Sequence, residues 1–151
     1  MINYVDGDAT QPIGEGQKLI VHCCNDIGAW GAGFVLALSK RWKRPEQVFT
    51  SEPRLLLGTV QFVRVTKDIV VANLVGQRGV AQWNGQAPIR YGAVREGMET
   101  VAEYARKHNM SIHMPRIGCG LAGGTWDHIE PILMDKLKGL DVVVYDLVTK
   151  E

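Results

Sequence analysis

The hydrophobic and polar positions of this chain alternate between short apolar runs and stretches of helical spacing. Strand-like apolar runs fall at 1–5, 18–23, 58–65, 69–75, 111–114 and 142–148. The two runs on either side of Thr66-Lys67-Asp68 predict a β-hairpin. Apolar residues at helical spacing occupy 34–42, 90–108 and 126–138. Strands that alternate with helices in this way predict an α/β fold with a mixed sheet.

Two prolines set the expected helix boundaries. Pro45 is expected to close the first helix, because proline interrupts a helix interior. Pro131 is tolerated only near a helix start, so the last helix is expected to begin at Asp127 or His128. The polar segment 76–88 is predicted to be a long loop of functional type.

Two of the strand-to-helix turns are rich in glycine. One spans 25–33, and the other spans 115–127 with four glycines among seven residues. A loop of exposed N–H groups at a helix N-terminus suits an anion, because the amides and the helix dipole point the same way. The alternative is a plain tight turn, since the spacing is neither a P-loop nor GxGxxG. If both turns face one cleft at the carboxyl ends of the strands, each can hold one phosphate of a diphosphate.

Composition and charge limit the class of protein and the partners that it can have. The 151 residues are 46% hydrophobic and 22% charged, as in an ordinary globular domain. A net charge of +1 without a basic block argues against free nucleic acid as the main partner. No apolar run of 18 residues and no signal-peptide pattern occur, so a cytoplasmic protein without a membrane partner is expected. A monomer is the expected state. The three cysteines form no CxxC, and neither a metal site nor a cofactor is expected.

Four motifs, in order and at suitable separations, resemble those of the macro domain family. They are Gly7-Asp8-Ala9-Thr10, Val21-His22-Cys23-Cys24-Asn25, Trp30-Gly31-Ala32-Gly33 and the run from Pro115 to Gly124. The resemblance covers the whole chain, and implies that residues 1–151 form a single macro domain with three layers and a mixed central sheet flanked by helices. Within the family, the chain most resembles the branch with the yeast ADP-ribose-1''-phosphate phosphatase and the animal terminal ADP-ribose protein glycohydrolase. In that branch a tryptophan also follows the second glycine loop, as Trp126 does here.

The resemblance also implies a set of ligand-binding residues. Asp8, with Ala9 beside it, matches the aspartate that accepts a hydrogen bond from the adenine amino group; capping a turn is its alternative role. Asn25 matches the asparagine beside the distal ribose, with an Asx turn as the alternative. The two phosphate loops match Gly31, Ala32, Gly33, Ile117, Gly118, Cys119, Gly120 and Leu121. Trp30 and Trp126 are candidates for contacting the ribose or the base of the ligand. Their alternative role is to cover the hydrophobic core.

Three residues are candidates for chemistry. His22 stands where many macro domains have an asparagine, and a neutral imidazole can shuttle protons; a buried structural histidine is the alternative. Asn25 can orient the reacting groups. Asp127 is a second acid/base candidate, although an aspartate in a first turn also stabilises its helix.

Departures from the family pattern bear on mechanism. The animal glycohydrolase uses a lysine and an aspartate, and the best-matching positions here are Pro88 and Ala122. Residues 76–90 contain no lysine, which argues against covalent catalysis by a lysine. The sequence therefore favours an ADP-ribose-binding domain that acts as a phosphatase on ADP-ribose-1''-phosphate. A non-enzymatic reader of free or protein-linked ADP-ribose is the rival, and a de-ADP-ribosylating glycohydrolase is the third possibility.

Overall fold

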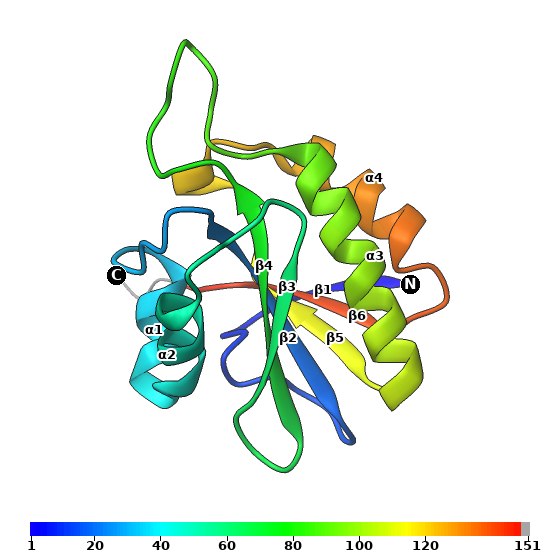
Figure 1. Cartoon of the computed structure of the whole chain (residues 1–151). Helices are drawn as coiled ribbons and strands as arrows, with labels where there is room; N and C mark the ends of the chain where they lie inside the picture. Colours follow the sequence, from blue (N-terminus) through cyan, green and yellow to red (C-terminus); the bar gives the residue numbers. More distant parts are fainter. Residues whose placement is uncertain (149–151) are drawn as a thin grey trace.

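A six-stranded mixed sheet lies between two pairs of helices in the computed structural model, which describes residues 1–148 (Figure 1). The strands are β1 (Ile2–Asp6), β2 (Lys18–Asn25), β3 (Val60–Arg64), β4 (Ile69–Gln77), β5 (Ser111–Met114) and β6 (Val142–Asp146). The helices are α1 (Phe34–Arg41), α2 (Arg44–Ser51), α3 (Tyr91–His108) and α4 (Trp126–Lys136). The sheet order is β1-β6-β5-β2-β4-β3. All neighbours pair in parallel except β3, which pairs antiparallel with β4. The expected three-layer α/β architecture and hairpin are confirmed.

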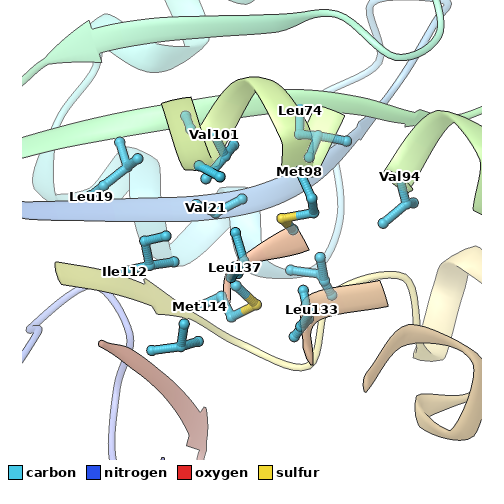
Figure 2. Close-up of a cluster of buried hydrophobic side chains, with 14 of the residues drawn as sticks. Leu19, Val21, Leu74, Val94, Met98, Val101, Ile112, Met114, Leu133 and Leu137 are labelled. Atoms are coloured by element: carbon cyan, nitrogen blue, oxygen red, sulfur yellow. The ribbon is translucent and has the colours of Figure 1, made fainter. Parts of the chain in front are cut away.

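The two faces of the sheet are covered by different helices. Successive side chains of β2 point to opposite faces and pack against different helices. Leu19 and Val21 belong to the larger core, which also contains residues of α3 and α4 (Figure 2). Ile20 points to the opposite face and packs with Leu38 of α1. Because successive strand side chains alternate between faces, an almost continuously apolar β2 is what a sheet covered on both sides requires.

The helix predicted over 34–42 is confirmed as α1, but the expectation that Pro45 closes it was wrong. Trp42 is extended (φ −141°, ψ 126°) and ends α1, and α2 then begins at Arg44 with Pro45 in its first turn. Proline is favoured there, because the N–H that it lacks would have no helical partner in a first turn. Pro45 therefore starts a helix that the sequence analysis missed.

Three other helix and strand boundaries differ from the predicted ones. Helix α4 begins at Trp126, so Pro131 lies inside it, on an exposed face where water can reach the carbonyl that proline leaves without a partner. Strand β4 runs on through Gly76 to Gln77, which shortens the expected loop. Strand β6 ends at Asp146, because Leu147 and Val148 turn out to solvent.

The parallel pairing places the carboxyl ends of β2, β4, β5 and β6 at one edge of the sheet. Both glycine-rich turns leave the sheet at this edge. Within residues 1–148, no helix is both long and apolar enough to cross a bilayer.

Candidate functional site

A cavity of about 710 Å³ opens at this edge, between the turns that follow β2 and β5. The end of β2, the two glycine-rich loops and the end of β4 line it. The lining residues are His22, Cys23, Cys24, Asn25, Ala29, Trp30, Gly31, Ala32, Gly33, Phe34, Val35, Gln77, Val80, Pro115, Arg116, Ile117, Gly118, Cys119, Gly120, Leu121 and Ala122. Both glycine-rich loops therefore face one cleft, which is the condition for each to hold one phosphate of a diphosphate.

The first loop (residues 25–33) presents backbone N–H groups at the N-terminus of α1. Gly33 is the N-cap, with φ 82° and ψ −143°, a conformation that a side chain would strain, and no side chain caps the helix. Among the described residues, no backbone carbonyl accepts a hydrogen bond from the N–H of Gly31, Ala32 or Gly33. Free amides at the positive end of a helix dipole are suited to an anion.

Asn25 organises the start of the first loop. Its Oδ1 accepts hydrogen bonds from the N–H groups of Ile27 and Ala29, and its Nδ2 donates to the carbonyl of Ala29 at 2.7 Å. This is the Asx arrangement that the sequence left as an alternative. An amide nitrogen carries two hydrogens, so one remains for a group in the cavity.

The second loop (residues 115–125) faces the first and contains a short 3₁₀ turn at Gly120–Ala122. Its shape is fixed by hydrogen bonds from Gly124 N–H to Gly118 O (2.8 Å) and from Gly123 N–H to Gly120 O (2.9 Å). Gly120 has φ +65°, and the space where its Cβ would lie is open. Across the opening, Leu121 Cδ1 lies 3.6 Å from where a Cβ on Gly33 would be, so the two loops meet.

His22 lies behind the cavity in a buried polar network. Its Nε2 lies 2.6 Å from Oδ1 of Asn73, whose Nδ2 donates to Pro45 O and Gln61 Oε1. Because Oδ1 must then accept, Nε2 of His22 carries the proton. Burial lowers the pKa of His22 to about 4, so its imidazole is neutral near pH 7. The rings of Trp30 and Phe34 pack against it, at 5.4 and 5.7 Å between centroids.

Comparison with known proteins identifies the family. A Streptomyces coelicolor macrodomain structure is 44% identical with a TM-score of 0.85, over 97% of this chain and 99% of that one. The chain belongs to the macrodomain family. A Bacteroides thetaiotaomicron protein of unknown function is more similar still, at 51% identity and a TM-score of 0.94, over 97% and 98% of the two chains.

Other relatives of this macrodomain carry functional names, although no family model matches the chain. A Candida albicans protein named ADP-ribose 1''-phosphate phosphatase is 28% identical over 152 residues, 89% of this chain and 93% of that protein. Mouse chromodomain-helicase-DNA-binding protein 1-like is 30% identical over 159 residues, 95% of this chain; the macrodomain spans only 17% of that protein's length. A Thermosipho africanus DarTG structure in complex with ADP-ribose shares the fold at 16% identity and a TM-score of 0.77, over 99% of this chain and 42% of that one.

The cavity of the macrodomain brings most of the expected site residues together. It gathers His22, Asn25, Trp30, Gly31, Ala32, Gly33, Ile117, Gly118, Cys119, Gly120 and Leu121. Asp8 and Ala9 lie outside this lining, in the turn after β1, where Asp8 Oδ1 accepts from the N–H and hydroxyl of Thr10. Asp127 is exposed in the first turn of α4 and Trp126 packs against Tyr4, so neither lines the cavity.

Sequence reasoning missed several lining residues. Gln77 and Val80 enter the cavity because β4 continues past Gly76. Arg116 also lines it, and its place directly before the glycine run was the signal that could have indicated it.

Proposed function

We propose that this macrodomain binds ADP-ribose in the cavity and removes the terminal phosphate of ADP-ribose-1''-phosphate. The observation that carries the proposal is one cavity in which both glycine-rich loops face each other. Its volume of about 710 Å³ lies within the range of about 300–1,000 Å³ that is typical of small-molecule sites.

The loops suit the diphosphate. The N–H groups of Gly31, Ala32 and Gly33 lie at the N-terminus of α1, and the second loop brings its glycines to the opposite wall. Two phosphates in series can each take one loop, since both loops line the same cavity and Leu121 of the second lies across from Gly33 of the first. Backbone donors and the positive end of a helix dipole hold such groups without a basic side chain.

A second cavity next to the first suits the terminal phosphate. It has a volume of about 480 Å³, and Val80 lines both cavities. Its lining includes two arginines, Arg78 and Arg90, and one aspartate, Asp26, which accepts a hydrogen bond from Gly79 N–H. Asn25, which matches the distal-ribose residue, directly precedes Asp26. A phosphate on the distal ribose would thus lie toward the two cations.

The reaction would be hydrolysis by water. Water attacks the terminal phosphorus, the P–O bond to the distal ribose breaks, and the ribose oxygen receives a proton, which gives ADP-ribose and inorganic phosphate. The cations of Arg78 and Arg90 would stabilise charge on the transferred group, and the remaining Nδ2 hydrogen of Asn25 would orient the ribose. The phosphatase name of the Candida albicans relative, which matches along almost its whole length, supports this reaction.

A reader of ADP-ribose without catalysis is the second candidate, and the placement of two residues favours it. His22 is neutral, 2% exposed and hydrogen-bonded to Asn73, which suits a structural role better than proton transfer. Asp127 is exposed on α4, outside the cavity lining. Binding by the loops needs neither residue.

Phosphate release from ADP-ribose-1''-phosphate tests the proposal. We expect release by the parent protein and by Gly139→Val, whose glycine has φ +81° and open space in a turn remote from the cavity. Gly120→Val should abolish release together with ADP-ribose binding. Arg78→Gln should slow release by about 10²-fold, in the range for loss of one charge-stabilising donor, and change ADP-ribose affinity by less than about threefold. A parent protein that binds ADP-ribose but releases no phosphate is a reader.

A further inference from the structure

Arg116 is paired with an aspartate at the end of the cavity near β6. Its Nε and Nη2 donate to Oδ1 and Oδ2 of Asp146, at 2.7 and 3.0 Å. A bidentate pair of this kind fixes the plane of the guanidinium as well as its position. It also occupies two of the three guanidinium nitrogens and neutralises much of the charge.

Two aromatic rings cover one side of this guanidinium. Its Cζ lies 5.1 Å from the ring centroid of Tyr4 and 5.2 Å from that of Trp126. The two centroids are only 6.2 Å apart, so both rings lie on the same side of Cζ. The rings are themselves fixed, because Trp126 Nε1–H donates to the Tyr4 hydroxyl at 2.9 Å and that hydroxyl donates to Glu130. Arg116 is also one of the residues that line the cavity.

This end of the cavity lies toward Asp8. Gly7 N–H donates to the carbonyl of Asp146 at 2.8 Å, so the turn that carries Asp8 is attached to the same residue that holds Arg116. Strands β1, β6 and β5 are consecutive in the sheet, which places Arg116, at the start of the second phosphate loop, on the side of that loop toward the Asp8 turn. A nucleotide with its phosphates between the loops and its base at Asp8 must pass Arg116.

We propose that the guanidinium of Arg116 is the stacking surface for the adenine base. The proposal rests on ADP-ribose binding in the cavity, the function proposed above. A planar guanidinium stacks well on aromatic faces. Here Asp146 and the two aromatic rings orient the guanidinium before a ligand binds. A base is favoured over a phosphate as its partner, because Asp146 already takes the hydrogen-bonding edge that would grip an oxyanion. Trp126, which follows the second loop in the sequence, then has a defined role: it supports Arg116 from behind.

Binding of ADP-ribose and of UDP-ribose, measured by calorimetric titration, tests the proposal. UDP-ribose keeps the diphosphate and the distal ribose but has a single-ring base with less surface to stack. Arg116→Lys keeps the charge and removes the plane, so ADP-ribose affinity should fall about tenfold, within the range for a shielded cation–π contact. UDP-ribose affinity should fall by less than about threefold. Arg95→Lys is the matched control, because Arg95 also pairs with an aspartate, Asp135, but on α3 and α4 away from the cavity; it should change neither affinity.

A second variant separates stacking from other roles. Trp126→Leu removes one supporting ring and leaves the pair of Arg116 with Asp146, so it should weaken ADP-ribose by about threefold and leave UDP-ribose unchanged. Equal losses for the two ligands would overturn the proposal and assign Arg116 to the phosphates or to loop structure. Unchanged affinity of Arg116→Lys for ADP-ribose would also overturn it. If the parent protein binds neither ligand, the proposed function fails as well, which the first titration shows.

Discussion

At the scale of single residues, Asp8 shows how a turn can prepare a side chain for a ligand. Its Oδ1 accepts from both the N–H (2.8 Å) and the hydroxyl (2.7 Å) of Thr10. Its Oδ2 lies 3.9 Å from Nη2 of Arg41, which also donates from Nε to the Thr10 hydroxyl at 2.8 Å. One carboxylate oxygen therefore caps the turn, and the other is oriented and can accept from an adenine amino group. The two roles that the sequence left as alternatives are compatible.

We expect Asp8→Ala to weaken ADP-ribose binding by roughly 10- to 150-fold, since a hydrogen bond to a charged group contributes about 1.5–3 kcal/mol. Calorimetric titration measures the effect, with thermal unfolding to verify the fold. Asp127→Ala is the control: it removes an exposed carboxylate in the first turn of α4 and should leave the affinity unchanged. Full affinity of a folded Asp8→Ala protein would remove Asp8 from the site.

At the scale of elements, the glycines of the second loop serve different purposes. A Cβ on Gly124 would lie 2.3 Å from the carbonyl oxygen of Gly118, so that glycine is required for the loop to close on itself. Gly120 lines the cavity, and a Cβ added there would meet nothing within 4 Å. Only the second kind of glycine reports on ligand binding.

Gly120→Val should therefore abolish ADP-ribose binding while the protein stays folded, because the side chain both strains a left-handed backbone and fills phosphate space. Gly139→Val imposes the same backbone strain elsewhere and should bind normally. Titration together with urea unfolding measures both effects. Normal binding by a folded Gly120→Val protein would make the loop only a turn.

The segment between β4 and α3 lacks a lysine that could form a covalent adduct with the ribose. Residues 76–90 contain no lysine, and position 122 is a buried alanine. Borohydride trapping in the presence of ADP-ribose should therefore label no residue of the site, as read by mass spectrometry of the intact protein. A reduced ribose adduct on the protein would contradict a mechanism that uses water alone.

At the scale of the whole molecule, two histidines buried in the sheet tie stability to pH. His22 pairs with Asn73, and His113 lies between Ser111 and the Tyr145 hydroxyl. Burial lowers the pKa of each to about 4, and the charge of Lys18 adds to the effect at His113. Unfolded histidines take up a proton near pH 6.5, so protonation between pH 6.5 and 4 favours the unfolded chain.

We expect the free energy of unfolding to fall as the pH is lowered from 6.5 to 4, by about 3 kcal/mol from His22 alone. Urea unfolding across this range measures the slope. His22→Gln should be less stable at pH 7 but show a shallower slope, whereas substitution of the surface residue His108 by Gln should keep the parent slope. A stability that stays flat between pH 6.5 and 4 would mean that these histidines are not buried as neutral groups.

The sequence by itself determined the strands, their order along the chain and the two glycine-rich loops. It could do so because these features depend on local pattern: continuous apolar runs for strands covered on both faces, and glycine where the backbone needs φ > 0. Pro45 was the local signal that misled, since proline both follows one helix and starts the next. The family motifs also indicated most of the residues that line the cavity.

Only the tertiary structure decided which side chains face the cavity and what holds them. His22 and Asp127 occupy equally suggestive places in the sequence, but β-sheet register buries the first against Asn73 and helix α4 turns the second to solvent. Arg116 and Asp146 are 30 residues apart, and Tyr4 and Trp126 are 122 apart, so their contacts exist only because β1, β6 and β5 lie side by side. Contacts of this kind depend on strand order in the sheet, which no local pattern in the chain contains.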